Sequence, residues 1–136
     1  MAKEKGGILK KAWLTSEHLL QNPQDIKVLH GDIHHQNILD FGVSGWLAID
    51  PKGILGERYF DYANIFCNPD AETATKSGRL ERQARVVSAI AGLDYQRLLQ
   101  WILAYAGLSA AWHFEDGSSA DLALEIAEIS SSLQYL

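Results

Sequence analysis

A polar loop between short apolar runs constrains the fold of this chain more than any other stretch. Residues 28–39 begin and end with apolar side chains, and the loop inside them carries Asp32 and Asn37. A second apolar run, residues 46–49, ends directly on Asp50. Short apolar runs bounded by glycine and polar residues are typical of strands. Because carboxylates and carboxamides at the ends of buried strands cost desolvation energy, the pattern indicates a site.

The spacing of these polar residues is specific. Asp32 and Asn37 stand at the interval of the catalytic Asp and Asn in the protein-kinase loop H-R-D-L-x-x-x-N, with glycine in the place of the arginine. Residues 30–37, followed by Asp50, resemble the catalytic segment of the aminoglycoside phosphotransferase superfamily, a branch of the kinase-like fold.

Residues 29–40 and 46–53 are most similar to the streptomycin 6-kinase and hydroxyurea phosphotransferase family of that superfamily. The resemblance extends over essentially the whole chain, but only over the C-terminal half of such an enzyme. It implies an α+β fold that is mainly α: the C-terminal lobe of a kinase-like fold, with a catalytic loop and a β-hairpin followed by a helical bundle. It also implies transfer of the γ-phosphoryl group of ATP to a hydroxyl of a small molecule, an aminoglycoside such as streptomycin.

The resemblance assigns roles to four residues. Phosphoryl transfer needs an aligned hydroxyl, metal ions on the phosphate oxygens and a carboxylate near the incoming oxygen. Asp32 corresponds to that carboxylate, and Asn37 and Asp50 correspond to oxygen ligands of a Mg²⁺ ion shared with ATP. Asp61 matches an acid at a helix start that hydrogen-bonds the catalytic loop. The helix dipole alone would also favour a carboxylate at that position.

The histidines around Asp32 leave an alternative open. In the kinase interpretation, His30 braces the loop and His34 contacts the acids on the metal side. Clustered His and Asp side chains also bind transition metals, and residues 31–34 are similar to the opening of a metal-dependent phosphoesterase. The later Gly-Asn-His and Gly-His-x-His patterns of such enzymes are missing from the sequence, so phosphotransfer is the first hypothesis.

A further acid lies close to the loop. Asp40, Phe41 and Gly42 spell the metal-binding triplet of protein kinases. Asp40 follows Asn37 too closely to be the metal-binding acid of a kinase-like site, whereas Asp50 has both the right interval from Asn37 and a strand before it. We therefore expect Asp40 to be a surface acid beside a turn.

Composition restricts the surroundings and partners. The 136 residues, with 47% hydrophobic and 21% charged side chains, favour a single domain over 1–136 rather than disorder. A net charge of -5 offers no basic surface for nucleic acid. The longest apolar run, residues 101–112, is shorter than the roughly 20 residues of a membrane span. The single Cys67 is expected to be a small buried side chain, and it fits a cytoplasmic location.

Apolar periodicity predicts a first helix. Residues 1–7 are charged and rich in glycine and are expected to be a frayed start. Residues 8–21 follow with the periodicity of an amphipathic helix, which places Leu9, Trp13 and Leu20 near one face, with Leu19 beside them.

The remaining elements are expected in this order: a β-hairpin at 38–50, a loop at 54–58, a helix at 59–68, a mobile segment at 70–78, and helices at 79–91, 95–113 and 119–134. Gly92 is expected to end the helix at 79–91, and Asp94 to cap the helix at 95–113. The helix at 95–113 is apolar almost all round, so it should be the buried spine of the domain. A capping box beginning at Ser118 should open the last one.

The sequence before the loop lacks the parts that hold a nucleotide. A kinase-like enzyme carries a phosphate-binding lysine on a strand, and residues 1–27 contain lysines but no run of strands. The chain is therefore expected to lack the N-terminal nucleotide lobe, to bind ATP weakly and to be inactive alone. The alternative is a non-catalytic remnant, a binding or oligomerisation module whose apolar surface takes that lobe or a second copy in a homodimer.

Overall fold

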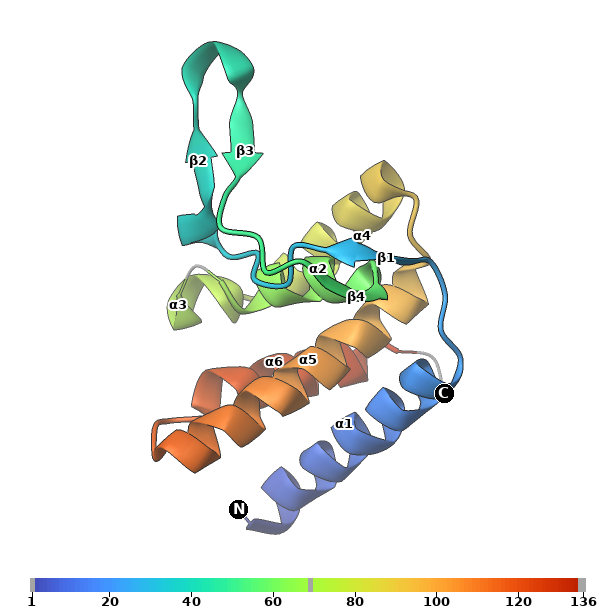
Figure 1. Cartoon of the computed structure of the whole chain (residues 1–136). Helices are drawn as coiled ribbons and strands as arrows, with labels where there is room; N and C mark the ends of the chain where they lie inside the picture. Colours follow the sequence, from blue (N-terminus) through green and yellow to red (C-terminus); the bar gives the residue numbers. More distant parts are fainter. Residues whose placement is uncertain (1, 69, 135–136) are drawn as a thin grey trace.

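The structure, a computed structural model, describes residues 2–68 and 70–134 as an α+β fold dominated by helices, with two small sheets. In chain order the elements are α1 (Ala2–Gln21), β1 (Ile26–Leu29), the 3-10 helix η1 (His35–Asn37), β2 (Ile38–Asp40), η2 (Gly42–Ser44), β3 (Trp46–Ala48), β4 (Ile54–Glu57), α2 (Tyr59–Asn64), η3 (Ile65–Cys67), α3 (Ala71–Ala74), α4 (Arg79–Ala91), α5 (Tyr95–Asp116) and α6 (Asp121–Ser132). Figure 1 shows the β2–β3 hairpin projecting away from the helical body.

Helix α5 is the centre of the core, since α1, α2, α4 and α6 all contact it. Its fully buried side chains include Leu98, Leu99, Ile102 and Leu103. Burial of each such side chain contributes about 1.5–3 kcal/mol. The predicted cap is present, because the Asp94 carboxylate accepts a hydrogen bond from the Arg97 amide. The prediction of a buried spine is confirmed, although the helix continues to Asp116.

The buried face of helix α1 is rotated from the predicted one. Leu19 is buried as expected, together with Ile8 and Ala12, whereas Trp13 is 60% and Leu20 is 72% exposed. The predicted frayed start is also wrong for the part of it that the structure describes, where the helix begins at Ala2.

A glycine in α5 sets the packing of α1. A Cβ atom built at Gly107 would lie 2.5 Å from the Cβ of Ala12, closer than side chains approach one another. The two small residues let the helices approach closely, so α1 rests on α5 through Ala12 and turns Trp13 outward. The helical period cannot reveal this, because it depends on a residue in another helix.

Both sheets are antiparallel pairs. Strands β2 and β3 are the two arms of the predicted hairpin, which is confirmed. Strands β1 and β4 pair with Leu29 opposite Ile54 and Ile26 opposite Glu57. The prediction of a loop at 54–58 is therefore wrong. The partner of β4 lies far back in the sequence, so its pairing left no local turn signal.

Two helix starts differ from the sequence expectation. The segment 70–78, for which no helix was predicted, contains α3, where the Asp70 side chain accepts a hydrogen bond of 2.8 Å from the Thr73 amide. The predicted capping box does not form, since Ala120 precedes α6 without a side-chain cap. Ser118 instead places its Oγ 2.8 Å from Nδ1 of His113.

The bounds predicted for α4 are confirmed, and the helix ends at Gly92, whose positive φ of 68° suits glycine. The predicted helix at 59–68 is divided into α2 and η3. Among the described helices, none combines the length and apolar character needed to cross a membrane.

Candidate functional site

The loop after β1 is held by a carboxylate from α2. Asp61 accepts hydrogen bonds from the backbone N–H groups of His30 (2.9 Å) and Gly31 (2.8 Å). Gly31 has a φ of +87°, a conformation that other residues rarely adopt. Asp61 therefore does not only interact favourably with the dipole of its own helix. Its carboxylate also accepts hydrogen bonds from two backbone donors of the loop that carries Asp32.

Replacing Asp61 by alanine is expected to lower the free energy of unfolding by about 3 kcal/mol, since two backbone donors lose an ionised acceptor. Urea denaturation measures the loss. Asp70→Ala is the matched control, because Asp70 also lies at a helix start but binds only its own helix. An equal loss in the two variants would contradict the bracing role of Asp61.

His30 ties the loop to the segment that follows the hairpin. Its Nδ1 accepts a hydrogen bond of 3.1 Å from the Asp32 amide, and its Nε2 lies 2.5 Å from the carbonyl oxygen of Ile49. A neutral imidazole with its proton on Nε2 satisfies both contacts. The amide of Lys52 donates in turn to the His30 carbonyl at 2.6 Å. His30 thus binds both the loop and the segment that follows the hairpin.

Asp32, His34 and Asn37 form one contact group. Asn37 is 8% exposed, and its Nδ2 donates to the Asp32 carbonyl at 2.9 Å and lies 3.5 Å from Asp32 Oδ2. Nε2 of His34 lies 3.0 Å from Asn37 Nδ2 and 3.7 Å from Asp32 Oδ2. The ammonium group of Lys52 lies 4.0 Å from the same carboxylate oxygen.

The backbone of Asp50 is placed beside this group. Its neighbour Ile49 donates from its amide to the Asn37 carbonyl at 2.7 Å. Asp50 has a φ of 55°, a left-handed conformation that is strained for a residue other than glycine. Strain of this kind gathers at functional sites, where the surrounding structure enforces it.

The residues that the resemblance assigns to Mg²⁺ are brought together only in part. Mg²⁺ in phosphoryl-transfer sites takes one or two carboxylates together with substrate phosphates and water, rather than an all-protein cage, and the oxygens of Asp50 and Asn37 are of that chemical kind. Asn37 contacts Asp32, whereas the Asp50 side chain is exposed and only the backbone next to it is bonded to Asn37. In the part of the chain that the structure describes, no group of three or more His, Cys, Asp or Glu side chains is arranged to hold a metal ion.

Asp40 lies outside this arrangement. It is exposed, and its Oδ1 accepts a hydrogen bond of 2.8 Å from the Gly42 amide at the tip of the hairpin. That is the local bond of an Asx turn, so Asp40 has the turn role expected from the sequence.

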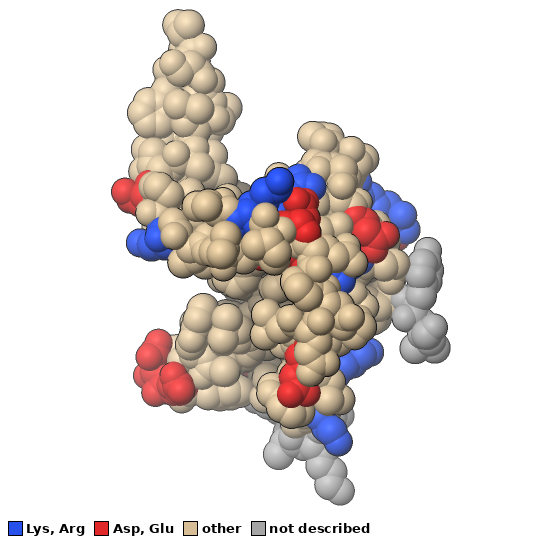
Figure 2. Space-filling view, turned by 45° about the vertical axis from the view of Figure 1, so that its right-hand side comes forward, with Lys and Arg blue, Asp and Glu red and all other residues tan. Residues whose placement is uncertain are grey.

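A polar cavity of about 450 Å³ opens beside Asp32. Its lining comes from the loop and η1 on one side and from α2, η3, α5 and α6 on the other: Asp32, His34, His35, Gln36, Asn64, Cys67, Asn68, Tyr105, Ser109, His113, Leu122 and Ala123. Figure 2 shows the surface hollowed between the part of the molecule that bears the hairpin and the helices below it. The cavity can hold a polar small molecule with a hydroxyl next to the Asp32 carboxylate.

The wall formed by α5 was not found from the sequence. Tyr105, Ser109 and His113 follow one another at intervals of four and share one face of the otherwise apolar stretch 101–114 of that helix. Burial, with smaller contributions from Cys67 and Asp32, raises the pKa of Tyr105 to about 12, so its phenol stays protonated and can donate. Polar residues at helical spacing within an apolar helix were the signal that would have revealed this wall.

Cys67 lies in the same cavity, and burial raises the pKa of its thiol to about 11. Since only the thiolate attacks disulfides, we expect Ellman's reagent at pH 8 to react about 100-fold more slowly with the folded chain than with the chain in guanidinium. The folded rate should rise with pH up to about pH 11. Equal rates in the folded and unfolded chain would show that the thiol is not protected.

Comparisons with known proteins identify the family of the chain. Residues 2–117 match the family model described as aminoglycoside/hydroxyurea antibiotic resistance kinase. A streptomycin 3''-kinase of Klebsiella pneumoniae is 53% identical over 114 residues, which are 80% of this chain and 43% of that protein. A streptomycin 6-kinase of Streptomyces griseus is 31% identical over 121 residues, 86% of this chain and 39% of that protein.

A hydroxyurea phosphotransferase of Kitasatospora aureofaciens is 30% identical over 101 residues, 74% of this chain and 28% of that protein. The chain thus spans less than half the length of these relatives. No solved structure matches it. The match of the family model over most of its residues shows that the chain belongs to the aminoglycoside/hydroxyurea antibiotic resistance kinase family.

Proposed function

We propose that this chain is the catalytic part of an ATP-dependent phosphotransferase, built as the C-terminal lobe of a kinase-like fold. The observation that carries the proposal is the position of Asp32. Its carboxylate borders the polar cavity and also lies within the contact group of Asn37 and His34. A hydroxyl in the cavity and a metal-bound phosphate at Asn37 would therefore meet at this residue.

In the proposed reaction the chain's own residues orient the acceptor. Asp32 accepts a hydrogen bond from the substrate hydroxyl and takes its proton as the oxygen attacks. Asn37 and Asp50 would hold Mg²⁺, which supplies charge neutralisation on the ATP phosphates when it is bound. Lys52, with its ammonium group 4.0 Å from Asp32, adds positive charge next to the transferred group.

The acceptor we propose is an aminoglycoside such as streptomycin. The cavity supports this with side chains that both donate and accept hydrogen bonds, among them Asn64, Asn68 and Ser109, which suit a polyhydroxylated molecule. The names of the relatives differ in the hydroxyl that is phosphorylated, 3'' in one and 6 in another. The proposal therefore covers the substrate class and not the position.

An exchange chimera tests the proposal. The matching segment of the K. pneumoniae streptomycin kinase is replaced by that of this chain, and transfer of labelled phosphate from ATP to streptomycin is measured. We expect the chimera to phosphorylate streptomycin and the isolated 136-residue chain to show negligible transfer. A soluble, folded chimera that binds streptomycin but transfers no phosphate would contradict the proposal.

A second candidate function has its own observation. The projecting hairpin exposes apolar side chains, including Phe41 (50%), Val43 (108%) and Trp46 (70%). Exposed apolar surface of this kind mediates association, so the chain would act as a module that binds a nucleotide lobe or a second copy. Light scattering distinguishes the candidates by molar mass. A stable homodimer that dissociates into monomers when Val43→Lys or Trp46→Lys is introduced would favour the module.

A further inference from the structure

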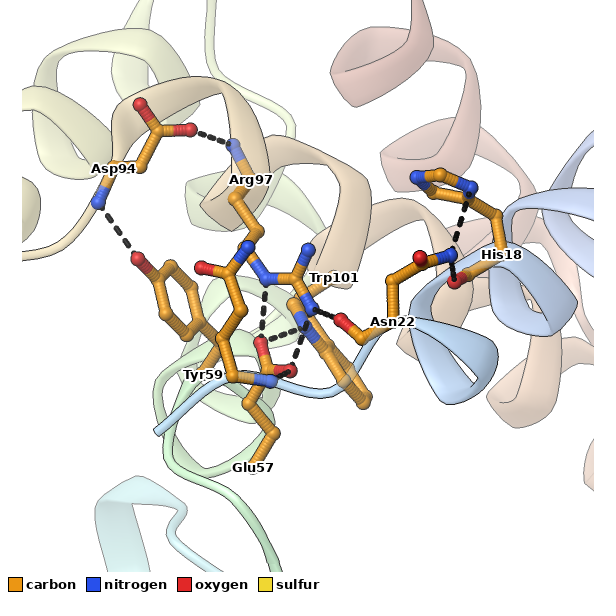
Figure 3. Close-up of polar contacts among 8 residues, drawn as sticks. His18, Asn22, Glu57, Tyr59, Asp94, Arg97 and Trp101 are labelled. Carbon is orange, nitrogen blue, oxygen red and sulfur yellow. Dashed lines mark hydrogen bonds and ion pairs between the residues drawn. The ribbon is translucent and has the colours of Figure 1, made fainter. Parts of the chain in front are cut away.

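Glu57, the last residue of β4, is the centre of a buried polar network. It is 4% exposed, and its carboxylate accepts four hydrogen bonds. Arg97 of α5 donates two of them, from Nε at 2.8 Å and from Nη2 at 2.6 Å. The others come from Trp101 Nε1 at 2.5 Å and from the Gln24 amide at 2.8 Å. Figure 3 shows the carboxylate enclosed by these groups.

The network continues through Arg97 to two more segments. Its Nη2 also donates to the carbonyl of Asn22, just after α1, at 2.7 Å. Its backbone amide binds Asp94, whose own amide donates to the Tyr59 hydroxyl at 2.8 Å. The hydrogen bonds that Arg97 donates to Glu57 are the largest cause that raises the pKa of Arg97, so its guanidinium stays charged.

A buried ion pair of this kind is a weak source of stability. Removing two charges from water costs about as much as their attraction returns, and apolar replacements are often neutral. Its value lies more in specifying one geometry, since a guanidinium and a carboxylate joined by two bonds fix both distance and angle.

Glu57 is joined to the strand that leads into the Asp32 loop. It pairs with Ile26 across the β1–β4 ribbon, and β1 runs from there to Leu29 and into the Asp32 loop. Arg97 lies on the helix whose later turns carry Tyr105 and the other residues of the cavity wall. The pair therefore joins the strand that leads to the proposed catalytic carboxylate to the helix that forms the acceptor wall.

We propose that Glu57, acting through Arg97, is a positioning residue that sets the Asp32 loop at a fixed place relative to the α5 wall of the cavity. The inference rests on the proposed function. Glu57 does not line the cavity, so its effect on the site passes through the β1–β4 ribbon on one side and through Arg97 on the other. Small displacements of reacting groups can lower a rate by about 100-fold, which makes such a distant support matter.

The test uses Glu57→Gln in the 136-residue chain, with hydrogen exchange and Mg²⁺ titration followed by NMR. We expect amide exchange at residues 28–34 to accelerate by at least 10-fold relative to α6. The concentration of Mg²⁺ needed to shift the amides of Asp32 and Asn37 should also rise by at least 10-fold. Ile126→Ala is the control, a cavity in α6 far from the ribbon, compared at a urea concentration that gives both variants the same global stability.

If amide exchange in residues 28–34 and the Mg²⁺ response of Glu57→Gln equal those of the Ile126→Ala control, the inference is overturned and Glu57 is only a structural residue. If Glu57→Gln does not fold, Trp101→Phe removes one of the four bonds to Glu57 while keeping an aromatic ring, and the same comparison applies. A wild-type chain in which Mg²⁺ shifts no loop amide would overturn the magnesium part of the proposed function instead. The exchange comparison would still decide whether Glu57 positions the loop.

Discussion

Asn in place of Asp32 is expected to lower phosphate transfer by the exchange chimera about 10³-fold, the usual contribution of a positioned general base. The backbone amide and carbonyl of residue 32 bind His30 and Asn37, so these bonds survive the substitution. The fold and Mg-ATP binding should therefore be retained. Steady-state kinetics with streptomycin measures the loss, which should fall on kcat.

Asp40→Asn is the matched control for this experiment. It changes the same side chain on the adjacent hairpin, where the carboxylate binds only the Gly42 amide within its own turn. We expect its activity to equal that of the parent chimera. If Asp32→Asn keeps a tenth or more of the parent kcat, or if Asp40→Asn loses as much, Asp32 is not the catalytic carboxylate.

Glycine in place of Asp50 is expected to have two effects of opposite sign. The loss of a metal ligand should weaken Mg-ATP binding by the chimera about 100-fold or more. The φ of 55° is strained for aspartate and free for glycine, so the folded state should gain about 1 kcal/mol. Calorimetric titration with Mg-ATP and urea denaturation measure the two effects on the same preparation.

The comparison with Asp32→Asn separates the two roles, because that variant should bind Mg-ATP normally while turning over slowly. Unchanged Mg-ATP affinity in Asp50→Gly would remove Asp50 from the metal site. A loss of stability together with a loss of affinity would mean that Asp50 supports the fold rather than being held under strain for binding.

The parts of the fold that local chemistry determines could be predicted from the sequence. Gly92 ends α4 and Asp94 begins α5 because the signals for both lie within a few residues of the boundary. The hairpin between Asn37 and Asp50 was likewise visible as two apolar runs around glycines. In the candidate site, the contact between Asp32 and Asn37 lies within one short loop, whereas the catalytic and metal-binding roles of Asp32, Asn37 and Asp50 come from the family resemblance and stay predictions.

What could not be predicted depends on pairs of residues far apart in the chain. Strand β4 exists because β1 is available to pair with it. The buried face of α1 follows from the contact between Ala12 and Gly107. Glu57 has no local feature that marks it, and only the structure shows that Arg97 and Trp101 converge on its carboxylate.

We propose that Asp32, Asn37 and Asp50 converge on one pocket in which Asn37 and Asp50 hold Mg²⁺ next to Asp32, and paramagnetic broadening tests this most directly. Mn²⁺ takes similar oxygen ligands and broadens the NMR signals of nearby amides even when it binds weakly. In the 136-residue chain we expect trace Mn²⁺ to broaden the amide signals of these three residues first and together, and excess Mg²⁺ to restore them. Broadening centred on Glu115 and Asp116 instead, or of Asp32 without Asp50, would contradict the claim.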